Sequence, residues 1–519
     1  MKHLQSILLI VTILGCAPSP KVDETTVDVY YSEQHRPQFH FSPETSWMND
    51  PNGMVYYEGE YHLFYQYYPD STVWGPMHWG HAVSTDLVSW EHLPIALYPD
   101  SLGYIFSGSA VIDWNNTSGF GSDENPPMVA IFTHHLMEGE KAGRTDYQYQ
   151  SIAYSLDKGR TWTKYEGNPV LPNQGIKDFR DPKVFWHEGA QKWVMILAVW
   201  DHVELYASPD LKSWEKLSDF GLGYGNHGGV WECPDLFELA VEGTEETKWV
   251  MIVSIGRGGP NKGSATQYFV GDFDGVNFTN ENPKKTELWI DYGTDNYAGV
   301  TWSDIPEEDG RRLFIGWMSN WLYATIVPTE KWRSAMTIAR ELTLKNTSKG
   351  TRVFSNPVEE FAKVRGISKP IEAQTVTGEL AINGLTFPVS LSEINLEFSE
   401  FEKSSEFGIE LSNSLGQKVL IGFEPDSNRY FIDRTNSGKS GFHEVFANRQ
   451  FGDRVSGSDK VGMKVLVDVS SIELFADEGA TVMTALVFPD EPYSQVKVFT
   501  KVGNVRLNEG RVVGIKRIW

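Results

Sequence analysis

A short apolar strand pattern recurs five times between residues 62 and 318, and this recurrence constrains the fold more than any other feature of the sequence. Each copy is rich in the β-branched and aromatic residues that favour strands. Counted from equivalent positions at 63, 129, 194, 250 and 314, the copies recur at intervals of 56 to 66 residues. The copies are HLFYQ (62–66), MVAIFT (128–133), WVMILA (193–198), WVMIVS (249–254) and LFIGWM (313–318).

A unit of about sixty residues has room for four short strands, which is the content of one β-propeller blade. Three segments between the copies share a Ser-x-Asp start and a closing Trp, which predicts a turn between two further strands. A stacked β-helix is the alternative, but its repeats are usually shorter. We therefore predict an all-β chain in which residues 36–350 form a five-bladed β-propeller. Strands preceding the five copies are expected to begin near Asp50, Phe106, Arg180, Trp231 and Tyr297.

The repeat stops after about residue 350. Segments such as KVLIGFE, RYFIDR and KVLVDVSSIELFA then alternate apolar and polar residues, the pattern of half-buried antiparallel strands. We predict a β-sandwich domain over residues 371–519 and a linker over residues 351–370.

The composition favours a neutral ligand. Lys and Arg total 45 against 69 Asp and Glu, which gives a net charge of −24. Such a surface repels phosphate backbones and anionic lipids, so we expect no nucleic-acid partner. The 18 tryptophans provide faces on which sugar rings can stack, although Trp is also a good core residue.

The N-terminus resembles an export signal. A charged start and an apolar run at 7–14 precede Gly15-Cys16, and the run is too short to span a membrane. The ILGC ending resembles a bacterial lipoprotein cleavage box. We therefore predict a signal peptide at 1–15, lipidation of Cys16 and a flexible tether at 16–35, placing an exported protein on the cell envelope through a lipid anchor. An ordinary signal peptide is the alternative. With only Cys233 left to pair, we predict no disulfide.

Three acidic residues lie close to prolines at the start of predicted first strands. Asp50 and Asp181 directly precede prolines, and Glu232 lies two residues before Pro234. A residue before proline is pushed into extended geometry, which suits the start of a strand. The first strand of each blade lines the central channel of a propeller, so we expect the three acids to converge there. One Asp-Pro pair alone would be read as a turn.

Converging carboxylates indicate glycoside hydrolysis, which needs one carboxylate as nucleophile or base and a second group that protonates the leaving oxygen. No His, Cys or Asp cluster has convincing zinc-ligand spacing, and no phosphate-binding glycine loop or nucleophile elbow is present in the sequence. We therefore predict no metal and no cofactor.

Nine segments together resemble glycoside hydrolase family 32, the family of invertases, inulinases and levanases that act on β-fructofuranosides. The resemblance runs from about residue 36 to the C-terminus and implies a five-bladed propeller followed by a β-sandwich. The segments are WMNDPNG, HLFYQYYP, WGHAVSTDLVSW, FSGSAV, FRDPKVFW, GGVWECPDLFEL, QYFVGDFDG, GWMSNW and VDVSSIELF.

By this resemblance Asp50 is the nucleophile, Glu232 is the acid/base, and Asp181 binds fructose hydroxyls and stabilises the transition state. The family retains anomeric configuration, so the Asp50 and Glu232 carboxyl groups should lie about 5–5.5 Å apart. The resemblance also implies substrate contacts for Trp47, Asn49, Gln66, Trp74, Phe106, Ser107, Arg180 and Trp317. From the residues alone, each of these contacts could instead serve packing, a turn or an ion pair.

Two positions depart from the family pattern. Asn296 stands where Phe is usual, which is expected to reshape the pocket wall beside Tyr297. Ala339 stands where Pro is common, which is expected to be a structural change.

The motif details look more like exo-acting levanases and inulinases than sucrose-specific invertases. We therefore expect an enzyme that releases fructose from a fructan or a sucrose-type oligosaccharide. An endo-levanase, an invertase, a fructosyltransferase and a non-catalytic fructan-binding lipoprotein remain as alternatives. An arabinan-degrading propeller enzyme would also use three acids, but the motif set does not fit it.

Overall fold

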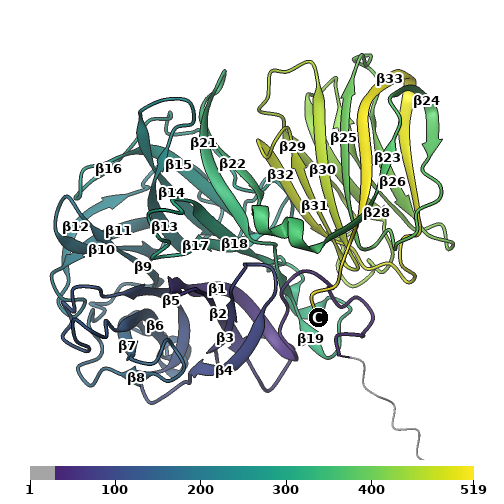
Figure 1. The fold of residues 1–519 in the computed structure, drawn as a ribbon. Coiled ribbons are helices and arrows are strands. Elements are labelled where there is room, and N and C mark those ends of the chain that lie inside the picture. The colour runs from purple at the N-terminus through teal and green to yellow at the C-terminus, as the bar shows by residue number, and fades with distance from the viewer. Residues whose placement is uncertain (1–29) are drawn as a thin grey trace, which may run out of the picture.

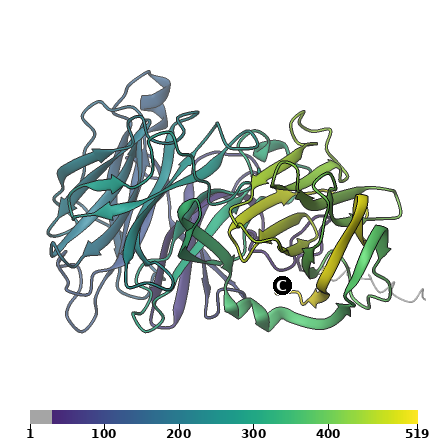
Figure 2. The same cartoon turned by 90° about the horizontal axis from the view of Figure 1, so that it is seen from above.

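The computed structural model describes residues 30–519, so the predicted signal peptide, Cys16 and most of the predicted tether lie outside the described residues. Two bodies lie side by side, and both are built from antiparallel strands (Figures 1 and 2). None of the helices in this part of the chain is long and apolar enough to cross a membrane.

The first body is a five-bladed β-propeller, as predicted. Each blade is a four-stranded core whose strands follow one another outward from the centre. Blade I also takes up β19 (Trp332–Arg333), which runs parallel to β1 and joins the end of the ring to its beginning.

The blade strands have the following bounds. Blade I contains β1 (Ser46–Tyr57), β2 (Glu60–Tyr68), β3 (His78–Ser84) and β4 (Glu91–Leu97). Blade II contains β5 (Tyr104–Ile112), β6 (Met128–His135), β7 (Gln148–Ser155) and β8 (Thr163–Lys164), with helix α1 (Met137–Lys141) after β6. Blade III contains β9 (Phe179–His187), β10 (Lys192–Val199), β11 (His202–Ser208) and β12 (Glu215–Phe220). Blade IV contains β13 (Trp231–Ala240), β14 (Thr247–Ile255), β15 (Ala265–Phe273) and β16 (Phe278–Asn280). Blade V contains β17 (Tyr297–Thr301), β18 (Arg312–Met318), β21 (Arg340–Thr347) and β22 (Gly350–Pro357), with η1 (Ala324–Ile326) and β20 (Ala335–Met336) between them.

The five apolar copies are the second strands of the blades. Each is covered on both faces, because an apolar cluster fills the space between every pair of neighbouring blades, including the last and the first. This double burial explains why these strands are apolar throughout rather than alternating. The Ser-x-Asp segments are turns, as predicted: Asp86 and Asp210 each accept two backbone N–H groups between a third and a fourth strand.

The second body is a β-sandwich, also as predicted. Its layers share β33 (Gln495–Ile515), a strand of 21 residues that pairs with strands of both layers. The other strands are β23 (Arg365–Ile371), β24 (Gln374–Ala381), β25 (Ser392–Ser399), β26 (Phe407–Ser412), β27 (Lys418–Glu424), β28 (Arg429–Asn436), β29 (Arg449–Asp453), β30 (Val461–Asp468), β31 (Ser471–Ala476) and β32 (Thr481–Leu486).

The junction is shorter than the predicted linker at 351–370. Most of β22 lies in that range but pairs with β21 as the outer strand of blade V, and β23 already pairs with β33 of the sandwich. Only the segment around η2 (Glu359–Val364) connects the two bodies. Buried ion pairs join them: Arg340 contacts Asp291 at 3.0 Å and Glu473 at 2.6 Å.

Candidate active site

All five first strands carry the same irregularity near their N-terminal ends. In each blade two consecutive residues of the first strand oppose a single residue of the second strand, which is a β-bulge. A bulge turns side chains that would otherwise point into the sheet, and bulges are common beside active sites. The bulged pairs are Asn49-Asp50, Phe106-Ser107, Asp181-Pro182, Cys233-Pro234 and Ala298-Gly299.

The bulges bring the three predicted acids to one end of the channel. Ser107 donates a hydrogen bond to Oδ2 of Asp50 at 2.9 Å, linking blades I and II. The backbone N–H of Cys233 donates to Oδ2 of Asp181 at 3.0 Å, linking blades III and IV. The Cys233 thiol lies 3.6 Å from Oδ2 of Asp50 and 3.7 Å from Oδ2 of Asp181, so it connects the two carboxylates.

The side chains directly before three of the bulges form a second network. Arg180 donates to Oε1 of Glu232 at 3.0 Å and to Oδ1 of Asp178 at 2.7 Å. Tyr297 donates its hydroxyl hydrogen to the other oxygen of Glu232. Arg180, Glu232 and Tyr297 occupy the same register position in blades III, IV and V, opposite Ala198, Ser254 and Trp317. Glu232 is therefore held from both sides by neighbouring blades.

Burial alters the protonation of this cluster. Burial raises the pKa of Asp50, and the charge of Glu232 adds to the shift, against hydrogen bonding by Asn49 and Ser107. Burial also raises the pKa of Asp181 to about 7, with Glu232 and Asp50 adding to the shift and Arg180 opposing it. The Cys233 thiol, buried beside these carboxylates, has its pKa raised well above the usual value and stays protonated.

A cavity of about 230 Å³ opens above the three carboxylates. Nine of the eleven predicted site residues line it: Asn49, Asp50, Gln66, Trp74, Phe106, Ser107, Arg180, Asp181 and Glu232. Sequence reasoning missed five further lining residues, namely His135, Glu140, Gln148, Asp178 and Trp321. Below the cavity the channel is closed, because Lys183 donates to the carbonyl of Thr301 at 2.5 Å and Thr301 donates twice to Asp235. The cavity is thus blind.

Trp47 and Trp317 do not contact the cavity, contrary to the prediction. Both side chains have 0% exposure, and they pack together behind the site at a centroid distance of 6.1 Å. The Trp47 indole donates to Oδ1 of Asn49 at 2.7 Å, so it positions a lining residue from beneath. Trp321, at the end of the GWMSNW motif, packs on both rings and presents the aromatic surface to the cavity.

The two departures from the family pattern lie outside the cavity. Asn296 is buried, and its amide donates to Oδ2 of Asp291 at 3.3 Å, so it does not form the pocket wall as expected. Ala339 is buried in the apolar cluster between blades V and I.

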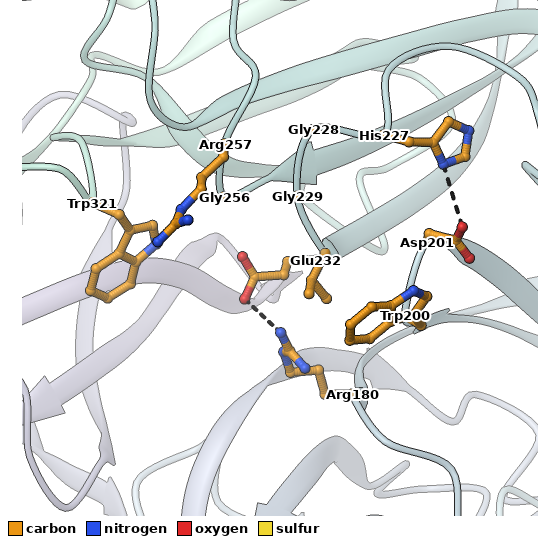
Figure 3. Close-up of a pocket in the computed structure, with 11 residues that line it drawn as sticks. Arg180, Trp200, Asp201, His227, Gly228, Gly229, Glu232, Gly256, Arg257 and Trp321 are labelled. Atoms are coloured by element: carbon orange, nitrogen blue, oxygen red, sulfur yellow. Dashed lines mark hydrogen bonds and ion pairs between the residues drawn. The ribbon is translucent and has the colours of Figure 1, made fainter.

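A wider cavity of about 560 Å³ adjoins the first one and shares Arg180, Glu232 and Trp321 with it. Figure 3 shows Glu232 and Arg180 between two walls, with Trp321 and Arg257 on one side and Trp200 on the other. Trp200 is 47% exposed, which leaves much of its ring open to a ligand. Sequence reasoning missed this outer wall, because its residues come from loops between blades.

One group of side chains within residues 30–519 has metal-ligand spacing. His202, Glu204 and Asp219 on blade III offer ligand atoms within 4.8 Å of one another. The ammonium group of Lys216 already lies 2.6 Å from both carboxylates, so their negative charge is compensated.

The comparisons agree with this geometry. The model of the glycosyl hydrolases family 32 N-terminal domain matches residues 40–357, and that of the C-terminal domain matches residues 360–513. A levanase of Bacillus subtilis is 51% identical over 495 residues, covering 94% of this chain and 72% of the relative. An extracellular exo-inulinase of Aspergillus niger is 41% identical over 494 residues, covering 88% and 90%. The crystal structure of an exo-inulinase from Aspergillus awamori matches with a TM-score of 0.86 and 36% identity, covering 94% of this chain and 100% of that one.

Proposed function

Because the chain belongs to glycoside hydrolase family 32, we propose that it is a retaining, exo-acting enzyme that releases fructose from the ends of β-fructofuranoside chains. The relatives named levanase and exo-inulinase support a levan- or inulin-type fructan as the substrate. Sucrose-type oligosaccharides present the same terminal fructosyl group and are expected to be cleaved as well.

One observation carries the exo mode: the cavity above the three carboxylates is small and blind. A volume of about 230 Å³ lies below the 300–1,000 Å³ typical of sites for drug-sized ligands, and it suits a single sugar ring. A ring in the middle of a polymer would need an exit on both sides. The shared wall at Arg180, Glu232 and Trp321 leads into the wider cavity, where the rest of the chain would lie.

In the first chemical step, the Asp50 carboxylate attacks the anomeric carbon of the bound fructosyl unit while Glu232 donates a proton to the glycosidic oxygen. The bond between the anomeric carbon and that oxygen breaks, and the leaving sugar departs as an alcohol. The fructosyl unit remains as an ester of Asp50. Positive charge that develops on the sugar ring is stabilised by the carboxylate of Asp181.

In the second step, Glu232 takes a proton from water, the water oxygen bonds to the anomeric carbon, and the ester bond to Asp50 breaks. Fructose leaves with its original configuration, and Glu232 is again protonated. Hydrogen bonds from Arg180 and Tyr297 hold the Glu232 carboxyl group in place through both steps. Ser107 holds Asp50 in the same way.

The early product profile on levan and inulin tests this proposal. Fructose alone from the first minutes is expected, because a blind pocket admits only chain ends. A ladder of oligosaccharides would show endo cleavage and would refute the exo mode. Longer oligosaccharides formed from concentrated sucrose would show transfer to a sugar instead of water, and binding without any product would leave only the non-catalytic alternative.

We further propose that the chain is exported and lipid-anchored through Cys16, with residues 1–15 as its signal peptide. The relative from Aspergillus niger is named extracellular, which supports export of this chain. Expression with a radiolabelled fatty acid tests the anchor: label and membrane attachment are expected for the parent and neither for Cys16→Ala. Membrane attachment of Cys16→Ala without label would refute the lipid anchor.

A further inference from the structure

A second cavity lies at the opposite end of the propeller channel. Its volume is about 640 Å³, and it shares no lining residue with the two cavities at the candidate active site. The same first strands reach both ends, since Asp181 and Lys183 both lie on β9 and Glu232 and Glu238 both lie on β13. We call this cavity the distal cavity.

The two ends are separate sites. Asp181 lies six residues before His187 on β9, and at about 3.3 Å per residue this corresponds to roughly 20 Å. Between them Lys183 donates to the carbonyl of Thr301 at 2.5 Å, and its ammonium group lies 3.5 Å from Asp235. This buried pair closes the channel, so a ligand in the distal cavity would not reach the carboxylates used for hydrolysis.

The walls of the distal cavity are aromatic. Trp114, Trp186 and Trp249 come from blades II, III and IV and contribute indole rings to it. Trp114 is 55% exposed, and its ring is fixed because its indole N–H donates to Asp304 at 2.8 Å. Trp249 is braced by Phe185 at a centroid distance of 5.6 Å. Fixed, partly open aromatic faces are suited to stacking against a flat apolar face of a ligand.

Polar groups without partners accompany these rings. Within residues 30–519 the Arg312 side chain makes no hydrogen bond or ion pair, and its Nε atom is buried. Ser303 is 9% exposed, and its hydroxyl also lacks a partner in this part of the chain. Both residues line the cavity. Buried donors without acceptors are costly, and a ligand with hydroxyl groups would satisfy them.

From these observations we infer that the distal cavity is a second carbohydrate-binding site, which takes one or two rings of a neutral oligosaccharide. A sugar ring has an apolar face for the tryptophans and hydroxyl groups for Arg312 and Ser303. The cavity carries charges of both signs, including Lys183 and Arg312 against Asp235 and Asp304, and the chain has a net charge of −24. This field disfavours an anionic ligand. The substrate polymer and an unrelated glucan are the two sources of such rings.

Calorimetric titration of the full chain in a Glu232→Gln background, which is expected to block turnover, tests the inference. The probes are a short β-fructan oligosaccharide and a malto-oligosaccharide of equal length. A second binding event, in addition to that at the candidate active site, is expected with at least one probe. Trp114→Ala and Arg312→Met should each weaken this second event by about tenfold or more, a loss typical of one stacking or hydrogen-bonding contact.

Tyr98→Ala is the matched control, because Tyr98 is also 55% exposed but does not line the cavity. Binding of the β-fructan probe would identify the substrate as the ligand, whereas binding of the glucan alone would identify a different polysaccharide. A single binding event with both probes, or a second event unchanged in both variants, would overturn the inference. Hydrolysis by the parent is measured separately, so its absence would refute the proposed function without affecting this site.

Discussion

Tyr297 on blade V donates a hydrogen bond to Glu232 on blade IV, while Arg180 on blade III binds the other oxygen of the same carboxyl group at 3.0 Å. These three residues occupy the same register position of successive blades. The propeller repeat thus supplies both the reacting carboxyl group and the two side chains that orient it.

Tyr297→Phe removes this hydrogen bond and leaves the ring in place. A hydrogen bond to a charged group contributes about 1.5–3 kcal/mol, so kcat is expected to fall by about 10- to 100-fold. KM and the thermal midpoint should change little, because the ring is buried and its packing is retained. An unchanged kcat would show that Arg180 alone orients Glu232.

The repeat made the architecture and the three acids predictable. Asp50, Asp181 and Glu232 stand beside prolines at equivalent places, and the bulges that turn them toward the channel follow from that recurrence. Tyr297 was missed because a tyrosine at the corresponding place gives no signal of its own. Aligning the fifth copy on the third and fourth would have found it.

Residues contributed by loops were not predictable in the same way. Trp317 and Trp321 stand four residues apart, and only the path of the chain after β18 decides that Trp321 reaches the cavity and Trp317 does not. Trp200 likewise follows the end of β10, and no periodicity places its ring. The domain junction was misplaced because β22 is polar enough to resemble a linker.

Asp50 and Glu232 have different proposed roles, and azide separates them. In Glu232→Ala, azide can attack the fructosyl ester of Asp50, so turnover should recover and give a fructosyl azide of retained configuration. Without azide this variant should lose about 10²- to 10⁴-fold in rate, the usual contribution of a general acid–base. Asp50→Ala cannot form the ester and should give no retained product. A retained product from Asp50→Ala, identified by NMR, would contradict its role as the nucleophile.

Asp181→Asn should abolish useful turnover and yet stabilise the protein near pH 8. Folding raises the Asp181 pKa from about 3.9 to about 7, so the folded protein binds this proton more tightly than the unfolded chain. Stability therefore falls as pH rises from about 4 to 7, by at most about 4 kcal/mol. The variant lacks this loss, so its thermal midpoint should exceed that of the parent at pH 8 but not at pH 4. The exposed Asp70→Asn is the control, and a parent more stable than Asp181→Asn at pH 8 would contradict the argument.

Trp47→Ala and Trp321→Ala should affect different properties. Trp47 is fully buried, and its truncation should cost about 3–5 kcal/mol of stability and lower the thermal midpoint. Trp321 lines both cavities, and its truncation should raise KM by about tenfold with a smaller loss of stability. Thermal unfolding and steady-state kinetics on the two variants distinguish these effects. A raised KM at unchanged stability in Trp47→Ala would restore the predicted substrate contact.

His40 links the segment before blade I to the sandwich and gives the interface between the two bodies a pH dependence. Its ring nitrogens lie 2.8 Å from Asp468 and 3.3 Å from Glu473. Burial lowers the His40 pKa, but the two carboxylates outweigh it and raise the pKa from about 6.5 to about 9.

A raised histidine pKa means that the stabilisation is complete below pH 6.5 and is lost as pH rises through 9, by about 3 kcal/mol in all. His40→Gln should therefore lower the thermal midpoint most at pH 6 and much less at pH 9.5. His443→Gln is the control, since no ion pair joins His443 to a carboxylate within residues 30–519. An equal loss for His40→Gln at both pH values would mean that its contribution comes from packing and neutral hydrogen bonds, without the ion pairs.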